Sequence, residues 1–374
     1  MLAKTVNGHE IIQLFEQFSP KAYAVEGDKI GLQIGTLNKK VTNVMITLDV
    51  LENVVDEAIE RKVDLIIAHH PPIFRPLKHV ATDQPAGRII EKCIKHDIAV
   101  YVAHTNLDVA DGGVNDLLAD ALELGETKVL VPTYEDPIKQ LALYVPVEFE
   151  EAIRTALGNA GAGHIGNYSH CAFSNEGTGS FLPSEEAVPF IGETGKLEFV
   201  KEVRIETIFP ASIEKQVIRE MIKAHPYEEV AYSVHTTDLP PIQKGLGRIG
   251  ELKEPMTLKD FTQFVKTKLD VNGARFVGDQ EAVVKKVAVL GGDGNKYIHQ
   301  AKRMGADVYV TGDLYFHVAH DAMMLGLNVV DPGHYAEKIM KEGVKTKLES
   351  LCIDKKYDVR FFVSESNTNP FQFV

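Results

Sequence analysis

The chain has 374 residues, of which 44% are hydrophobic and 25% charged, so it is long enough for two or three globular domains with sizeable cores. Its formal net charge of -13 argues against nucleic acid as a partner, because no basic surface is available to neutralise phosphates. The scattered, odd-numbered cysteines favour a reducing cytoplasm, residues 1–5 lead into an ordinary amphipathic segment rather than a signal peptide, and no apolar run approaches the roughly 20 residues that span a membrane.

Apolar runs alternate with amphipathic stretches in two parts of the chain. The first part predicts strands at 44–48, 65–68 and 98–103, separated by helices at 51–61 and 87–96. The same rhythm returns after residue 284, with strands at 287–290, 308–310 and 328–330, each followed by a helical stretch, and a last strand at 359–363. This alternation is typical of βαβ units, so we predict two α/β blocks.

The middle of the chain has a different order of elements. It predicts strands at 141–147, around 167–173, at 200–209 and at 230–235, with helices at 149–157 and 213–224. That order is ferredoxin-like. Turn-forming residues mark both edges, Glu135-Asp136-Pro137 and Pro240-Pro241. We therefore predict an α/β core split into residues 1–133 and 240–374, with an inserted α+β domain at 134–239.

Two adjacent histidines, His69 and His70, follow the apolar run at 65–68. Neighbouring side chains inside a strand point to opposite faces, so both can reach one site only where the strand ends. Pro71 restricts the backbone of His70, and a stiff turn with two imidazoles suits a transition metal. The alternative is that one histidine caps a loop while the other is half-buried.

Further imidazoles and carboxylates follow other strands. His104 and Asp108 come after the strand at 98–103, and His334 and Glu337 come after the strand at 328–330, three residues apart on one helical face. Ligands of open α/β sheets gather at the carboxyl ends of strands. We therefore expect these side chains to share one sheet edge with the histidine pair, with enough ligands for two metal ions.

Two glycine-containing turns also follow strands, at 291–294 and 311–313. Glycines let backbone N–H groups approach a phosphate, although turns of this kind are more often only tight turns, which we favour. His317 and His320 follow on the next helix. One of them could face the pocket as a proton donor, and His320 is the better candidate.

Taken together, these segments resemble the GTP cyclohydrolase I type 2 family, also called the Nif-three-like or DUF34 family of dinuclear metal proteins. The resemblance covers both outer blocks and includes the turn at 27–35, the histidine pair, the segments 104–108 and 333–337, and both glycine turns. It implies that His69, His70, Asp108, His334 and Glu337 bind two divalent metal ions per subunit, with Asp108 and Glu337 as bridges. It also implies a toroidal homohexamer. Zinc, iron and manganese all suit such ligands.

The insert resembles PII-like and CutA-like trimerising domains, and its His225-Pro226-Tyr227-Glu228-Glu229 segment resembles their signature before the last strand. His225 is then either a metal ligand or part of a turn that packs and contacts neighbouring subunits. We favour the turn.

The resemblance implies a hydrolase for a small-molecule, nucleotide substrate. The leading hypothesis is hydrolysis of GTP to formate and 7,8-dihydroneopterin triphosphate, with His104 or His320 as the catalytic group that moves protons. A metal-dependent phosphatase or phosphodiesterase would use the same site. A third alternative is a metal-binding regulatory or chaperone protein without catalysis.

Overall fold

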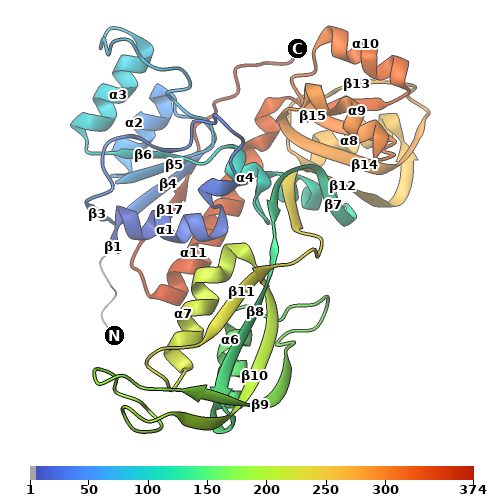
Figure 1. The fold of residues 1–374 in the computed structure, drawn as a ribbon. Coiled ribbons are helices and arrows are strands. Elements are labelled where there is room, and N and C mark those ends of the chain that lie inside the picture. The colour runs from blue at the N-terminus through green and yellow to red at the C-terminus, as the bar shows by residue number, and fades with distance from the viewer. Residues whose placement is uncertain (1–5) are drawn as a thin grey trace. The chain divides into compact units, whose positions relative to one another are not determined.

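The computed structural model describes residues 6–374, which form two compact units. One unit comprises Met1–Tyr134 with Lys244–Val374, and the other is the continuous segment Glu135–Gln243 (Figure 1). The insert was expected at 134–239, so the observed segment begins one residue later and ends four residues later. The expectation about a signal peptide concerns residues 1–5, which lie outside the described residues. No helix within residues 6–374 has both the length and the apolar character needed to cross a bilayer.

The first sheet of the split unit has five strands in the order β17-β4-β5-β6-β2. Four are parallel and β2 is antiparallel to β6. Helices cover both faces, as is usual for strands that are apolar throughout (Figure 1). The strands are β2 (Gly31–Ile34), β4 (Asn43–Thr47), β5 (Leu65–Ala68), β6 (Ala99–Val102) and β17 (Arg360–Val363), and the helices are α1 (Gly8–Phe18), α2 (Glu52–Glu60), α3 (Pro85–Lys95) and α11 (Met340–Lys355).

The second sheet has six strands in the order β13-β16-β15-β14-β12-β7. The three parallel strands in its middle are the predicted ones, while the outer strands were not predicted. The strands are β7 (Gly125–Asp136), β12 (Ile242–Thr257), β13 (Arg275–Val277), β14 (Val283–Asp293), β15 (Val308–Gly312) and β16 (Asn328–Asp331), and the helices around them are α8 (Leu258–Lys268), α9 (Ile298–Arg303) and α10 (Phe316–Leu325). One hydrophobic cluster joins side chains of both sheets.

The last strand, β17, belongs to the first sheet and not to the second α/β block, where the sequence predicts it. The sequence places it after the second block, but it pairs with β4 of the first sheet. Alternating apolar residues predict a strand and do not say which sheet it joins. The long helix α11 carries the chain back, since it contacts α1, β4 and β17.

The insert has the ferredoxin-like arrangement, with antiparallel strands in the order β11-β8-β10-β9. Both of its helices pack against one face of the sheet. Its elements are β8 (Ile138–Pro146), α6 (Glu150–Asn159), β9 (Phe173–Phe181), β10 (Glu198–Pro210), α7 (Glu214–Ala224) and β11 (Tyr232–Thr236). Its likeness to PII-like and CutA-like domains stays a prediction.

The strand expected around 167–173 is wrong in position, because β9 begins where that prediction ends. Gly177 and Gly179 disfavour a strand on local preference. Pairing with β10 makes this segment a strand nevertheless, with Gly177 opposite Glu202 and Gly179 opposite Val200.

Short elements complete the split unit. Strand β1 (Val6–Asn7) pairs with β3 (Lys40–Val41). The Asn7 side chain caps α1 by accepting from the backbone N–H of His9, and the Glu10 carboxylate accepts from the backbone N–H of Asn7. The remaining short helices that matter for the site are α4 (Thr105–Val109), α5 (Val114–Ala121) and the 3₁₀ helix η5 (His334–Ile339).

Candidate metal centre

A cluster of imidazoles and carboxylates lies where the carboxyl ends of two sheets meet. His69 and His70 follow β5, while His104 and Asp108 follow β6. Glu337 comes from η5, after β16 of the second sheet. The sequence prediction placed these groups at one sheet edge, but they come from two sheets of the same unit. The two sheets are brought together by packing between residues far apart in sequence, and hydrophobic periodicity does not predict such packing.

Glu337 stands between two groups of possible ligands. Its Oε1 lies 3.8 Å from Nε2 of His69, and that same nitrogen lies 3.6 Å from Oδ1 of Asp108. Its Oε2 lies 3.1 Å from Nε2 of His70 and 3.2 Å from Nε2 of His334. The ligand atoms of His69, Asp108 and Glu337 lie within 4.8 Å of one another, and so do those of His70, His334 and Glu337. A third group that meets the same limit comprises His69, His70 and His104. The two oxygens of one carboxylate therefore face two adjacent groups of potential ligands.

Every imidazole of the cluster is oriented through its Nδ1 atom. In His69 this nitrogen donates to the carbonyl oxygen of Ala103 at 2.9 Å, which leaves Nε2 as an acceptor facing the centre. Carboxylates accept from the other three at 2.6–2.8 Å, with the pairs being His70–Asp49, His104–Asp28 and His334–Asp313. A hydrogen bond of this kind fixes the orientation and the tautomer of a metal-binding histidine. Sequence analysis gave these aspartates no role, since nothing local links them to their histidines.

Two atoms at the centre are buried without a hydrogen-bond partner, Nε2 of His69 and Oδ1 of Asp108. Buried polar atoms in native proteins are nearly always satisfied. Their separation of 3.6 Å is too long for a hydrogen bond, but it suits two ligands that each lie about 2.0–2.2 Å from one transition-metal ion. The residues present therefore fit a metal ion.

The pKa shifts of the cluster also indicate that it favours positive charge. Burial raises the pKa of Glu337, but hydrogen bonds from the surrounding histidines outweigh it and hold the pKa well below its usual value. Burial lowers the pKa of His70, yet hydrogen bonds to Asp49 and Glu337 raise it to about 10. In the same way the pKa of His334 rises to about 9. Without a metal ion, protons on these rings balance the buried carboxylate, and metal cations would supply the same charge.

The segment that carries His334 and Glu337 is a 3₁₀ helix, where the sequence predicts the start of a longer helix. With three residues per turn, side chains three apart lie directly above each other, which brings both groups to the centre. Gly333 precedes this helix with φ 83° and ψ 157°, a backbone conformation essentially confined to glycine.

The cluster opens into a cavity of about 740 Å³. Its lining includes the glycine turn at 291–293 and the C-terminal residues Thr368 to Phe371. A Cβ atom at Gly292 would lie 2.9 Å from Oε1 of Glu337, so the turn makes room for this carboxylate. That close approach supports the tight-turn interpretation of the glycines.

The two candidate catalytic histidines lie in different surroundings. His104 lines the cavity, and its ring centre is 5.2 Å from that of His69. His320 is exposed on α10 against Phe316, and it is not among the residues that line the cavity. The structure thus brings together His69, His70, His104, Asp108, His334 and Glu337, and leaves His320 outside.

The split fold and the cluster define a class of protein, an α/β protein with a histidine and carboxylate centre suited to metal. Residues 6–370 match the model of the Duf34/NIF3 (NGG1p interacting factor 3) family, and the chain belongs to this family. A Bacillus subtilis (strain 168) protein named "GTP cyclohydrolase 1 type 2 homolog" is 76% identical, with 100% of both chains covered. A Listeria monocytogenes protein of the same name is 49% identical over 99% of this chain and 100% of its own.

Two solved structures are also similar to this chain over nearly its whole length. A Bacillus cereus protein related to NIF3 is 61% identical and superposes with a TM-score of 0.94 over 100% of both chains. A Staphylococcus aureus protein is 33% identical, with a TM-score of 0.74 over 99% of both chains.

Proposed function

We propose that this protein is a metal-dependent hydrolase that acts on GTP, releasing formate and forming 7,8-dihydroneopterin triphosphate. The observation that carries the proposal is the position of Glu337, whose two oxygens face two separate groups of ligand atoms. The names of the Bacillus subtilis and Listeria monocytogenes relatives support the choice of reaction.

In this proposal Glu337 is shared by two metal positions. His69 and Asp108 would complete one position, and His70 and His334 would complete the other. The geometry favours Glu337 as the bridge, since Asp108 approaches only the first group. Two divalent ions held here would lower the pKa of a bound water and polarise the bond that it attacks.

His104 is the residue that we assign to proton transfer. The Asp28 carboxylate accepts a hydrogen bond from its Nδ1 at 2.8 Å and also accepts one from the backbone N–H of Thr105 at 2.9 Å. Asp28 thus fixes the ring while His104 lines the cavity. A histidine held in this way can receive a proton at Nε2 and return it to a leaving group.

The cavity suits a nucleotide in size and chemistry. Its volume of about 740 Å³ lies within the usual range for small-molecule sites. Lys296 lines it as a cation for phosphate, while Phe74 and Tyr297 provide flat apolar surface for a base.

The proposal is tested by loading the protein with iron, zinc or manganese, adding GTP, and measuring formate together with pterin fluorescence. We expect formate and pterin in equal amounts with at least one metal, and none from the Glu337→Gln variant. Glu342→Gln, which changes an exposed carboxylate on α11, is the matched control and should behave as the unaltered protein. The absence of formate with all three metals would refute the proposal, and phosphate release without formate would favour the phosphatase alternative.

A further inference from the structure

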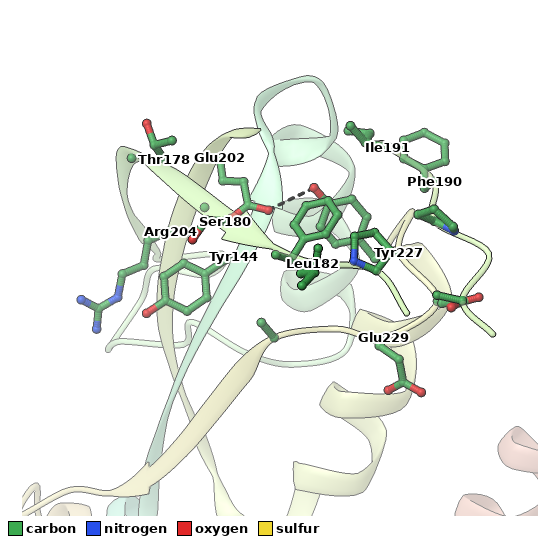
Figure 2. A pocket seen from close by; sticks show the side chains of 18 of the residues that line it. Tyr144, Thr178, Ser180, Leu182, Phe190, Ile191, Glu202, Arg204, Tyr227 and Glu229 are labelled. Carbon is green, nitrogen blue, oxygen red and sulfur yellow. Dashed lines mark hydrogen bonds between the residues drawn. The ribbon is translucent and has the colours of Figure 1, made fainter. Parts of the chain in front are cut away.

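The insert contains a cavity of its own, of about 730 Å³ (Figure 2). It lies on the sheet face opposite the two helices. Leu143 and Val145 of β8 pack beneath α6 and α7, so Tyr144 between them points to the other face. The loop between β9 and β10 and the segment 225–231 complete the walls.

Aromatic rings that are tilted toward one another form part of the cavity wall. Tyr227 is central, since its ring centre lies 6.0 Å from that of Phe181 and 6.4 Å from that of Phe190. Leu182 and Ile191 add aliphatic surface beside these rings (Figure 2). Walls of this kind favour a planar ligand, which can lie against the aromatic faces.

The least exposed charged group that lines the cavity is the carboxylate of Glu202, a residue that is only 9% exposed. Its Oε1 accepts a hydrogen bond from the Tyr227 hydroxyl at 3.0 Å (Figure 2). Among the described residues, none donates a hydrogen bond to its Oε2. A Cβ atom at Gly179 would lie 2.0 Å from this oxygen, so the glycine gives the carboxylate its place. Oε2 is not among the buried side-chain atoms that lack a partner, so it is accessible to solvent and can accept a hydrogen bond from a ligand.

Hydrogen bonds hold the surrounding residues in place. The backbone N–H of Tyr227 donates to Nδ1 of His225 at 3.1 Å, and Nε2 of His225 donates to the carbonyl oxygen of Tyr144 at 2.9 Å. Both ring nitrogens of His225 are thus used within the insert, which supports the predicted turn rather than a metal ligand. Glu228 accepts from the backbone N–H of Val188 at 3.2 Å and ties the loop to the same segment.

The charges around the cavity select for a ligand that donates hydrogen bonds. Glu202, Glu228 and Glu229 line it, and its cation, Arg204, already pairs with Glu206. A carboxylate accepts hydrogen bonds and repels anions, so N–H groups are favoured over phosphate at this position. Two adjacent N–H donors on a planar ring match the two oxygens of one carboxylate.

We propose that this cavity binds a small planar nitrogen heterocycle whose adjacent N–H and NH₂ groups pair with Glu202. That donor edge, a 2-amino-4-oxo-pyrimidine, is shared by guanine and by pterins. The site is distinct from the metal centre, which belongs to the other unit. The proposal stands whatever reaction the metal centre performs.

Calorimetric titration of the full chain with guanosine, neopterin and adenosine tests this. Guanosine or neopterin should bind, and the tighter of the two identifies the source of the donor edge. Adenosine should not bind, because its ring nitrogen at the corresponding position is an acceptor. Glu202→Gln should weaken binding by about tenfold or more, as expected on loss of a charge-assisted hydrogen bond. Glu342→Gln, at an exposed carboxylate of α11 in the other unit, should bind as the unaltered protein, and any binding step that Glu202→Gln leaves unchanged belongs to the cavity of the metal centre.

Two further variants help to distinguish a loss of ligand binding from a loss of folding. Gly179→Ala places a methyl group where Oε2 of Glu202 lies, so it should also weaken binding. Glu176→Gln changes an exposed carboxylate on the same strand and should have no effect. Circular dichroism checks that each variant is folded. The proposal is overturned if neither guanosine nor neopterin binds, if folded Glu202→Gln binds as tightly as the unaltered protein, or if sedimentation shows that Glu202→Gln alters self-association while ligand binding is unchanged.

Discussion

If two metal ions share Glu337 as proposed, removing Glu337 should empty both positions, whereas removing a histidine should empty one. The two oxygens of Glu337 face different groups, Oε1 toward His69 and Oε2 toward His334. His69 and His334 each belong to a different group beside it. We therefore expect Glu337→Ala to lose all bound metal, and His69→Ala and His334→Ala to lose about half each.

The expected size of the effect follows from the number of ligands. Residues that only orient a metal ligand change metal affinity by about 10–100-fold when they are replaced. Glu337 offers a ligand atom to each of two groups, so its loss should exceed about 100-fold at both, or about 2.7 kcal/mol each. The fold should survive, because the hydrophobic cluster that joins the two sheets contains no metal-centre residue.

Elemental analysis after dialysis against a weak chelator measures the outcome, with Glu342→Ala as the exposed control on α11. Thermal unfolding confirms that each variant is folded. If folded Glu337→Ala retained as much metal as His69→Ala or His334→Ala, the shared position of Glu337 would be refuted.

Two other predictions concern Asp49, which orients His70, and His225 of the insert. Asp49→Asn weakens the acceptor that orients His70, so metal affinity should fall about 10–100-fold in a chelator competition, and an unchanged affinity would contradict the orienting role. His225 titrates in the insert: burial lowers its pKa below the usual 6.5, so the unfolded chain takes up the proton first as pH falls. The stability of the insert should therefore be full above about pH 6.5 and decline below it in urea unfolding, and His225→Gln should remove part of that decline; equal slopes in both proteins would argue against this account.

The sequence predicts the residues of the centre because each follows a short apolar strand. That local pattern is strong for β5 and β6, and the observed strands differ from the predicted ones by about one residue. The outer strands β7 and β12 were missed. They lie where the chain passes into and out of the insert. Strand β7 is mostly exposed, and the buried middle of β12 at 245–250 is rich in glycine, so neither has the apolar run of a central strand. Partners far apart in sequence, such as His70 with Asp49 or β17 with β4, depend on tertiary packing that no local pattern encodes.

Two glycines beside His334 allow a last prediction, because they restrict the same histidine for different physical reasons. Gly333 has open space where a Cβ atom would lie, so Gly333→Ala is costly only through its backbone conformation, by about 1–3 kcal/mol. Gly312 has ordinary backbone angles, but a Cβ atom there would lie 2.8 Å from the backbone nitrogen of His334.

Both substitutions should displace His334 and lower metal affinity, while Gly326→Ala, at a positive φ of 63° beyond α10, tests backbone strain away from the centre. Chemical unfolding of the metal-free protein and chelator competition separate the two quantities. We expect Gly326→Ala to lower the free energy of unfolding without changing metal affinity, and Gly333→Ala to lower both. If Gly333→Ala reduced stability alone, the conformation of this glycine would serve the fold and not the metal centre.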